Sequence, residues 1–516
     1  MKKINKEILQ LVIPLAIVSF IFSGCASHKV INRSDHTHDV PGKKINFPGR
    51  SDLTSKAYTH YMRGSLYERQ NRLDKALQEF ELASNYDKES SAIYVKLGTL
   101  YFKKGDFTRS TAQLKKVLEL EPKNIQVRLL LGVIYTTLGD FPQATILYEE
   151  VIKIDADNKQ AFLSLADVYI LQQQIEKAII LYEQVIGKKG DIPYVFFNLG
   201  MLYSQVNKYD EAIQNLEKAI ELSPEYLEAY LGLGLVYELK KEIDKSQNVY
   251  EQVISIRPDN PLAYFRLGQM FAEQKKNEEA LALFNKVLEI NPRIVDAYFE
   301  VAHILLRIDR TDEAIEMLQR AEPLVKRKAY VFLLLGLANS LKENFTEAED
   351  YYKKTIALTP DDDMAYFYLG ALYEKQGKQD LAAEQFHKTL EVNPNNSDAC
   401  NYLGYMYAEK EQNLEEAVGL IKRAVVLEPD NGAYIDSLGW VYYKQGKFDE
   451  ALKYLEKAVT ILDTDAVIYD HLGDVYHEKG FFDEAKRAWE RSLEIDPAQP
   501  QVQKKINNLF GEMEKK

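Results

Sequence analysis

Cysteine, glycine and proline are all scarce in this chain. Its 516 residues include two cysteines, 25 glycines and 16 prolines. The two cysteines, Cys25 and Cys400, stand in different chemical contexts, which argues against a disulfide framework. Hydrophobic residues make up 46% of the chain and charged residues 28%, so we expect a folded core and not a disordered chain.

A basic surface is also missing. The chain has a formal charge of −13. Residues 1–50 hold eight basic and three acidic residues, so the remainder carries 57 basic and 75 acidic residues, a net of −18. An acidic chain repels nucleic acid and anionic lipid at long range, and no basic stripe offsets this repulsion. The composition therefore argues against nucleic acid as a partner.

Motifs of known catalytic use are absent from the sequence. It has no glycine-rich phosphate loop, no nucleophile elbow and no paired-histidine spacing for a metal. His303, His387, His471 and His477 do not cluster in sequence, and we expect lone surface histidines. Cys400 is expected to be a buried apolar residue, not a nucleophile. We therefore predict no enzymatic activity, no cofactor, no metal and no small-molecule substrate.

The first 24 residues have the pattern of an export signal. Lys2, Lys3 and Lys6 form a positive start, and an apolar run from Ile8 to Phe22 follows. This run is shorter than the roughly 20 residues that a bilayer-spanning helix needs. Residues 1–24 are therefore predicted to be a secretory signal and not a permanent transmembrane helix.

The sequence Ser23-Gly24-Cys25 resembles the bacterial lipobox, although Phe22 replaces the usual Leu, Val or Ile. The resemblance implies that Cys25 becomes a lipidated first residue, whose acyl chains anchor the protein stably. Ala26, in place of Asp, implies the outer membrane, facing the periplasm. The alternative is an ordinary signal peptide cut nearby. Residues 25–56 contain Pro-Gly pairs and scattered histidines, and they are predicted to be a flexible tether.

A period of 34 residues runs through the rest of the chain. It is marked by a small residue, usually after leucine, and every step is 34 residues except one of 35. The thirteen small positions are Gly64, Gly98, Gly132, Ala166, Gly200, Gly234, Gly268, Ala302, Gly336, Gly370, Gly404, Gly439 and Gly473. The pattern predicts thirteen repeats over residues 57–499.

Further columns keep the same phase. An aromatic residue usually follows the small position by three, as at Tyr67 and Tyr101, and a second small residue follows later, as at Ala76. A large apolar residue comes four residues after that, from Phe80 in the first repeat to Trp489 in the last. Within a repeat, apolar residues recur at helical spacing in two bursts, so each repeat is predicted to be two helices.

These columns resemble the tetratricopeptide repeat. The resemblance implies an all-α, right-handed superhelical solenoid of thirteen helix-turn-helix repeats. Because each helix pair leaves an apolar face uncovered, neighbouring pairs must stack. Small residues let the two helices approach closely, and a glycine such as Gly377 can take the left-handed conformation after the first helix. Residues 500–516 carry Val502, Ile506, Leu509 and Phe510 among polar residues and are predicted to be a C-terminal capping helix.

In this family the first helix of each pair lines the concave surface. The column three residues before the small position is apolar in ten repeats and polar or acidic in the last three: Tyr61, Val95, Leu129, Leu163, Phe197, Leu231, Phe265, Phe299, Leu333, Phe367, Asn401, Asp436 and Asp470. A second column adds Met201, Tyr405 and Trp440. This groove is predicted to bind a protein or peptide, with its acidic end attracting a basic segment. The alternative is that many of these side chains simply pack against the next helix.

Trp440 and Tyr443, beside Asp436, are the predicted centre of binding, since Trp and Tyr carry disproportionate binding energy. Irregularities near Pro193, Pro323 and Gln412 are either bends with a role in binding or neutral loop variation.

Two functions fit these features. The first is a membrane-anchored, periplasm-facing adaptor that recruits substrates to a periplasmic protease or cell-wall hydrolase, by analogy with bacterial repeat lipoproteins. The second is an assembly factor of an outer-membrane polysaccharide-export or pilus machine.

Overall fold

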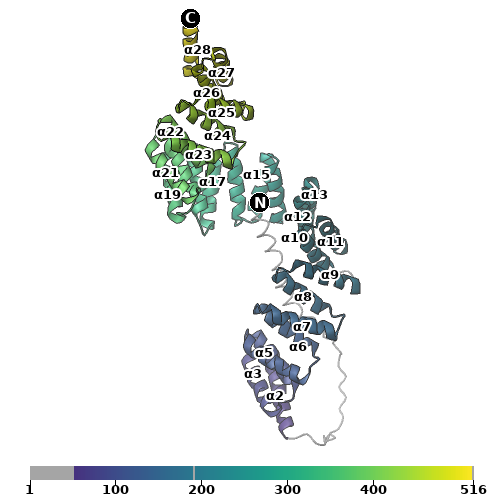
Figure 1. Cartoon of the computed structure of the whole chain (residues 1–516). Coiled ribbons are helices and arrows are strands. Elements are labelled where there is room, and N and C mark those ends of the chain that lie inside the picture. The colour runs from purple at the N-terminus through teal and green to yellow at the C-terminus, as the bar shows by residue number, and fades with distance from the viewer. Residues whose placement is uncertain (1–51, 190–191, 514–516) are drawn as a thin grey trace. The chain divides into compact units, whose positions relative to one another are not determined.

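The structure, a computed structural model, describes residues 52–189 and 192–513 (Figure 1). Within these ranges every regular element is helical: 27 α-helices, labelled α2 to α28, and one short 3-10 helix, η1. The predicted export signal, the lipidated Cys25 and most of the predicted tether lie outside the described residues. The chain divides into two compact units, residues 1–258 and residues 259–516, and each is described separately.

In the described part of the first unit, twelve helices follow one another as six antiparallel pairs (Figure 1). They are α2 (Asp52–Arg69), α3 (Leu73–Tyr86), α4 (Ser91–Lys103), α5 (Phe107–Leu120), α6 (Ile125–Thr137), α7 (Phe141–Ile154), α8 (Lys159–Leu171), α9 (Ile175–Lys189), α10 (Pro193–Gln205), α11 (Tyr209–Leu222), α12 (Leu227–Leu239) and α13 (Ile243–Ile256).

The described part of the second unit has seven further pairs and a last single helix. These are α14 (Pro261–Glu273), α15 (Asn277–Ile290), α16 (Val295–Arg307), α17 (Thr311–Ala321) with η1 (Glu322–Leu324), α18 (Ala329–Leu341), α19 (Phe345–Leu358), α20 (Asp363–Lys375), α21 (Gln379–Val392), α22 (Ser397–Glu409), α23 (Leu414–Leu427), α24 (Gly432–Lys444), α25 (Phe448–Ile461), α26 (Ala466–Glu478), α27 (Phe482–Ile495) and α28 (Pro500–Met513). The prediction of an all-α solenoid of helix pairs is confirmed.

The turn inside each pair depends on one residue with a positive φ, seven positions after the small residue. Gly377 adopts the left-handed conformation expected of it, with φ at 71°. Most of the equivalent positions are not glycine: Lys241, for example, has φ at 63°. A side chain in this conformation is strained, so packing of the two helices holds the turn in shape even where the local sequence does not favour it.

The small column is explained by the close contact between the two helices of a pair. A methyl group added at Gly234 would lie 2.6 Å from the ring of Tyr250, which is fully buried in the second helix of the same pair. The same aromatic or aliphatic residue faces the small position elsewhere, as Phe284 does at Gly268. The prediction that small residues allow this approach is confirmed.

Recurrent polar contacts join many neighbouring pairs within each unit. Where the aromatic residue of a first helix is tyrosine, its hydroxyl often donates a hydrogen bond to a glutamate on the preceding second helix. The Tyr476 hydroxyl, for example, donates to Oε1 of Glu456 at 2.9 Å. A lysine that ends a first helix pairs with an aspartate at the start of the preceding second helix, as in Lys240 with Asp210 at 2.7 Å. These exposed pairs contribute little each, and stacking of apolar faces supplies most of the stability.

The irregular positions have local causes. Pro193 occupies the first turn of α10, where its missing N–H is not needed. Pro323 ends a second helix early, because α17 stops at Ala321 and the chain passes into η1. The extra residue of the eleventh pair is absorbed in its turn, where both Glu411 and Asn413 have positive φ.

The two ends of the described helical array differ from the predicted boundaries in one respect. The first helix begins at Asp52, so residues 52–56 of the predicted tether are helical; no proline or glycine interrupts the chain between Asp52 and Gly64. The capping helix forms as α28, with Val502, Ile506 and Leu509 buried against α27. None of the helices in the described ranges combines the length and the apolar character that crossing a bilayer requires.

Candidate protein-binding surface

Within each unit the first helices of successive pairs form a shared surface, here called the inner face. In the first unit α6 approaches α8, and α10 approaches α12; in the second unit the same holds for α14 and α16, α18 and α20, α22 and α24, and α24 and α26. No two successive second helices in the described residues approach each other to the same extent. Helices on the inside of a curve lie closer together, so each unit curves toward its first helices, which line its concave side.

All the side chains predicted to line the groove lie on first helices, and none is highly exposed. Those that stay partly exposed are Tyr61, Val95, Leu163, Leu231, Phe265, Phe299, Asn401, Tyr405, Tyr443 and Asp470. Those that are buried are Leu129, Phe197, Met201, Leu333, Phe367, Asp436 and Trp440. The inner face therefore offers a partner the edges of these side chains, and much of their surface is already used in packing.

Ring contacts show what the aromatic residues of the predicted inner-face column pack against. Tyr61 meets Phe80 edge-on, with ring centroids 5.4 Å apart, and Phe265 meets Phe284 in the same way at 5.4 Å. In both cases the partner is the large apolar residue of the second helix in the same pair. These side chains help to close the core of their own pair.

The most open aromatic group on the inner face of the second unit involves α16 and α18. Tyr330 is 45% exposed, and its ring lies edge-on to Phe299 with centroids 5.1 Å apart. Its hydroxyl lies 3.0 Å from Nε2 of His303. Burial lowers the pKa of His303, which favours the neutral imidazole, and a neutral imidazole can accept a hydrogen bond from the Tyr330 hydroxyl. An accessible aromatic edge with a polar tip is a common anchor for a protein partner.

A buried ion pair joins α24 to α26. Nδ1 of His471 lies 2.9 Å from Oδ1 and 3.2 Å from Oδ2 of Asp436, and the two residues are 5% and 6% exposed. Burial disfavours the charged imidazole, but the charge and hydrogen bond of Asp436, with Asp470 and Asp474 behind it, outweigh this effect and raise the pKa of His471. The expectation of a lone surface histidine is wrong for His471, because the aspartate one repeat earlier faces it across two adjacent helices.

Trp440 completes this cluster. Its ring stacks on His471, with centroids 3.9 Å apart, and on Tyr443, at 4.8 Å. Its indole N–H donates to Oε1 of Glu409 on α22 at 2.6 Å. Trp440 is 8% exposed, so it connects three successive first helices and presents only a small part of its ring to a partner.

The capping helix contributes a lysine to the same end of the inner face. Nζ of Lys505 on α28 lies 2.8 Å from Oδ1 of Asp470 and 2.6 Å from Oδ1 of Asp474 on α26. Asp474 also accepts the indole N–H of Trp489 at 3.1 Å. Burial raises the pKa of Asp474 in spite of the opposing effect of Lys505, so this carboxylate holds its charge less readily than an exposed one.

Negative charge dominates this end. Burial, together with Glu409, Asp436 and Asp470, raises the pKa of Tyr405 well above its ordinary value. Burial and the carboxylates of Asp474 and Glu478 raise the pKa of Tyr443 to about 12. Both phenols therefore stay protonated and can donate hydrogen bonds, in a surrounding that favours a cationic partner group.

Sequence reasoning missed Glu409, His471, Asp474 and Lys505 as members of this cluster. The available signal was their spacing: His471 follows Asp436 by 35 residues, and Lys505 follows Asp470 by 35. In a solenoid with a 34-residue period, residues about one repeat apart on first helices face each other. The expectation that Cys400 is a buried apolar residue is confirmed, since its side chain is fully buried in α22.

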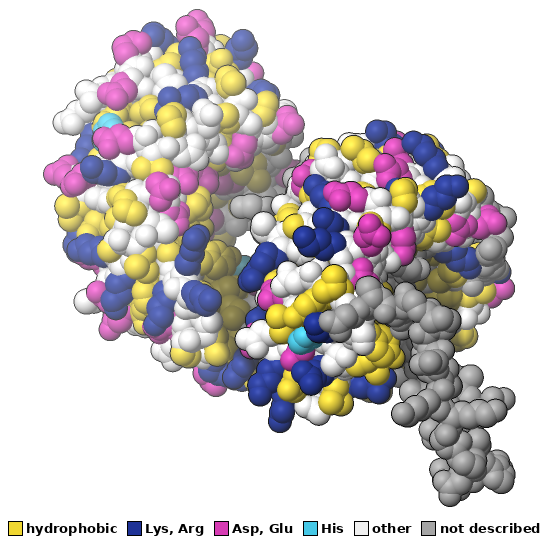
Figure 2. Space-filling view, turned by 90° about the horizontal axis from the view of Figure 1, so that it is seen from below, with side chains coloured by type: hydrophobic (Ala, Val, Ile, Leu, Met, Phe, Trp, Pro, Cys, Tyr) yellow, Lys and Arg dark blue, Asp and Glu magenta, His cyan; other side chains and the backbone are white. Residues whose placement is uncertain are grey.

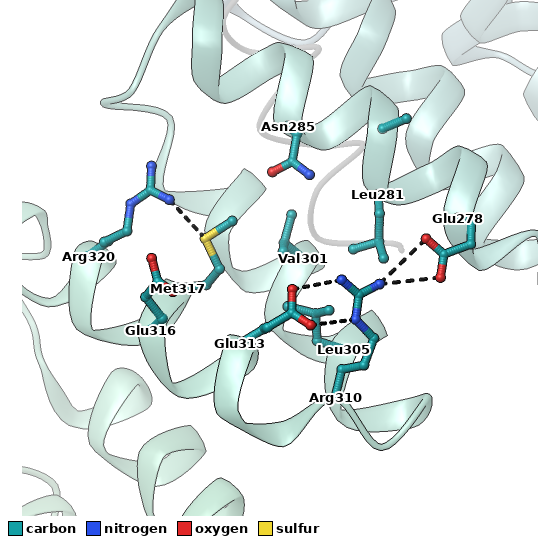
Figure 3. A pocket seen from close by; sticks show the side chains of 11 residues that line it. Glu278, Leu281, Asn285, Val301, Leu305, Arg310, Glu313, Glu316, Met317 and Arg320 are labelled. Carbon is teal, nitrogen blue, oxygen red and sulfur yellow. Dashed lines mark hydrogen bonds and ion pairs between the residues drawn. The ribbon is translucent and has the colours of Figure 1, made fainter.

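A hollow lies on the side of the second helices, between α15 and α17, with α16 as its floor (Figure 3). Its volume is about 360 Å³. Arg310 bridges the hollow by pairing with Glu313 at 2.6 Å and with Glu278 at 3.3 Å. Because Arg310 is already paired with two carboxylates and the hollow is open, it has the character of a gap between neighbouring second helices.

On the face shown in Figure 2, acidic, basic and hydrophobic side chains are interspersed. Groups of three or more histidine, cysteine, aspartate or glutamate side chains placed to hold a metal are not found in the described ranges. What the inner face can do chemically is to bind, through aromatic edges, phenol donors and carboxylates.

Family comparisons agree with the repeat geometry. Models described as "Tetratricopeptide repeat" match residues 57–90, 95–159, 160–188, 227–260, 261–294, 283–316, 351–384, 369–434 and 466–499. A model described as "TPR repeat" matches residues 202–241 and 439–480. Together these matches cover most of the thirteen helix pairs. A search of curated proteins finds no match.

Three solved structures are similar to this chain. The Cut9–Hcn1 hetero-tetramer of the APC/C is 16% identical, with 89% of this chain and 99% of that chain covered and a TM-score of 0.43. Yeast Tom70 is 18% identical, with 89% and 96% covered and a TM-score of 0.36. MamA protein is 26% identical over 33% of this chain and 93% of that chain, with a TM-score of 0.32. The identification rests on the family models and the repeat columns: the chain belongs to the tetratricopeptide-repeat family.

Proposed function

We propose that this protein is a lipid-anchored scaffold on the periplasmic side of the bacterial envelope, which recruits a protein partner along its inner face. Tetratricopeptide-repeat proteins bind protein or peptide partners and are typically non-enzymatic. The observation that supports the proposal best is the chemistry of the inner face in the second unit. There, the half-exposed Tyr330 lies on α18, and the acidic cluster of Asp436, Asp470 and Asp474 lies on α24 and α26.

This surface favours a partner segment that carries both apolar and basic side chains. An apolar side chain can pack on the edges of Phe299 and Tyr330, which are already in contact with each other at 5.1 Å. A lysine or arginine can approach the partly exposed carboxylates of Asp470 and Asp474, because one lysine, Lys505, faces both of them. A segment of this kind would lie along the first helices as an extended chain or as a helix.

The anchoring part of the proposal rests on the sequence of residues 1–25. Replacing Cys25 by serine removes the thiol that would receive the lipid. We expect the wild-type chain to incorporate labelled palmitate in a bacterial host and the Cys25→Ser variant to incorporate none. Label that persists in the variant would show that Cys25 is not the anchor.

The recruiting part is tested by affinity purification of the tagged full chain from solubilised envelope, followed by mass spectrometry. We expect a periplasmic protease or a cell-wall hydrolase, and an outer-membrane pore or pilus assembly would favour the second function instead. Tyr330→Ala should reduce the recovered partner by about ten-fold, as the loss of a central aromatic contact does. The matched control is Tyr86→Ala, an exposed tyrosine on a second helix, which should leave recovery unchanged.

A further inference from the structure

Asp167 is a carboxylate on the inner face of the first unit that has no cationic partner among the described residues. It lies on α8, one residue after the small position, in the same column as Met201, and it is partly exposed. Its Oδ1 accepts a hydrogen bond from the hydroxyl of Tyr182 on α9 at 3.2 Å. No described lysine, arginine or histidine contributes to its electrostatic surroundings. A carboxylate that its neighbours partly remove from water is stabilised by an opposite charge, and Asp167 lacks one.

Burial makes the charge of Asp167 sensitive to pH. It raises the pKa of this carboxyl group to about 6, although the hydrogen bond from Tyr182 opposes the shift. The other titratable groups that face it are the phenols of Tyr148 on α7, Tyr182 on α9 and Tyr194 on α10. Burial raises the pKa of Tyr148 and Tyr194 to about 12 and that of Tyr182 well above its ordinary value, so these phenols stay neutral. Within this set, Asp167 alone changes its charge between pH 5 and pH 7.

The last helix pair holds the same arrangement with a cation in place. Asp474 stands at the equivalent position of α26, and its carboxylate accepts the indole N–H of Trp489 on α27 at 3.1 Å. Lys505 on α28 completes the group, with its Nζ 2.6 Å from Oδ1 of Asp474. Trp489 and Lys505 follow the aspartate by 15 and 31 residues. An aspartate in this column, with an aromatic donor beside it, is therefore within reach of a lysine ammonium group.

Around Asp167 the same spacings lead to neutral residues. Tyr182 follows it by 15 residues and replaces Trp489 as the aromatic donor. Asn198 on α10 stands where Lys505 stands at the end of the array. The amide of Asn198 donates to the Tyr182 hydroxyl at 3.2 Å and brings no positive charge. The first unit therefore has the acidic half of this ion pair without the cation.

We propose that Asp167 is a binding site for a lysine or arginine side chain of the protein partner, which supplies the charge that Lys505 supplies to Asp474. Oδ2 of Asp167 accepts no hydrogen bond within the described ranges and can receive this group. Leu163 lies one turn earlier on α8 and is partly exposed, so the aliphatic part of the incoming side chain can pack on it. This site rests on the proposed function, because it requires a protein partner on the inner face, and it specifies the chemistry that the first unit recognises.

A metal ion is a poorer occupant. Calcium and magnesium take about six or more oxygen ligands in proteins. Asp167 offers one carboxylate, and groups of three or more metal-binding side chains are not found in the described part of the chain. A lysine or arginine needs a single carboxylate as its partner.

The purified full chain can be used to select binders from a displayed library of random short peptides, in parallel with two variants. Asp167→Asn removes the charge but keeps an oxygen that can accept from Tyr182. Asp244→Asn is the matched control, because Asp244 is exposed on the second helix α13. We expect the wild type and the control to enrich a class of peptides with a lysine or arginine beside apolar residues, and Asp167→Asn to lose this class. Selection of the same basic peptides by all three proteins would overturn the site while leaving binding by the inner face intact. Failure of the wild type to enrich any peptide would overturn the site together with the proposed function.

One enriched peptide then measures the affinity by fluorescence anisotropy. Asp167→Asn should bind it about ten-fold more weakly than the wild type. Asn198→Lys places an amine where Lys505 stands relative to Asp474, so it should block the site and weaken binding to a similar extent. Asn198→Gln adds length without charge and should bind as the wild type does. An Asn198→Lys variant that binds as tightly as the wild type would contradict the assignment.

The pH dependence of this binding is a readout that a purely structural role of Asp167 would not produce. A blocked peptide without histidine or acidic residues should bind the wild type about ten-fold more tightly at pH 7 than at pH 5. The reason is that a carboxyl group with a pKa of about 6 is mostly protonated at pH 5 and mostly charged at pH 7. Asp167→Asn should remove this dependence. A wild-type affinity that stays constant from pH 5 to pH 7 would overturn the proposal.

Discussion

At the scale of single residues, the turns show how a local conformation is tolerated because of its surroundings. Each pair reverses at a residue with positive φ, and this residue is glycine at 105, 139, 377, 446 and 480 but asparagine, glutamine, lysine, aspartate or glutamate elsewhere. Glycine adopts this conformation at no steric cost, whereas other residues are strained there. The helices on both sides are packed firmly enough to impose the turn.

Two glycine substitutions should therefore have opposite effects. Gly446 has φ at 72°, and an added methyl group would meet nothing within 4 Å, so Gly446→Ala adds backbone strain alone. We expect a loss of about 1 kcal/mol in stability. Gly419→Ala, in the exposed interior of α23 and equally free of contacts, should instead raise stability by about 0.5–1 kcal/mol. Thermal denaturation of both variants beside the wild type measures this, and equal shifts in one direction would contradict it.

At the scale of helices, the interface between α24 and α26 depends on a buried pair of opposite charges. The pKa of His471 is raised in the folded protein by Asp436. A raised histidine pKa means that the stabilising charge is fully present below the unfolded value of about 6.5 and is lost as the pH rises through the folded value. Trp440 stacks on His471, so the protonation of this histidine affects the packing of the predicted binding centre.

The stability of the last pairs should therefore fall as the pH is raised from about 6 to about 9. We expect amide hydrogen exchange in α24 to α27 to speed up over this range beyond its intrinsic base catalysis, while α4 to α7 follow the intrinsic rate. Asp436→Asn should cost about 1–3 kcal/mol at the lower pH and remove most of the pH dependence. A variant that keeps the full pH dependence would show that another group is responsible.

At the scale of the whole molecule, each helix pair contacts mainly the pairs next to it within its own unit, so damage should stay local. Contacts between elements in the described ranges run almost entirely between neighbours in the chain. The stability of such an array is the sum of pair stabilities and of the interfaces between adjacent pairs. A single free energy of unfolding does not describe it, and local measurements are needed.

A cavity at one end tests this view. Phe80→Ala removes a fully buried ring in α3 and should cost about 3–5 kcal/mol. Hydrogen exchange should accelerate in α2 to α5 and stay unchanged in α20 to α23. Phe386→Ala, which removes the equivalent ring in α21, should produce the reverse pattern. Acceleration throughout the chain by either variant would show that the array unfolds as one cooperative body.

The 34-residue period was enough to predict the helix pairs, the close packing at Gly234 and the capping helix α28. These features can be predicted from local sequence, because the helical spacing of apolar residues, the small residues and the turn residues all occur within the sequence of one repeat. The sequence also predicted that the residues of the inner-face column lie on first helices. The extent to which each member is buried was not, because Phe197 and Leu163 share a column but differ in exposure.

The sequence by itself determined the repeat unit, its number of copies and the polar or acidic character of one inner-face column in the last three repeats. The tertiary structure alone decided that Asp436 meets His471 and that Trp440 is largely buried between them and Glu409. The physical reason is that these contacts are made between repeats. The sequence gives the residue type at each position of a column. How much of that side chain a partner can reach depends on the residues that pack against it from the neighbouring repeats.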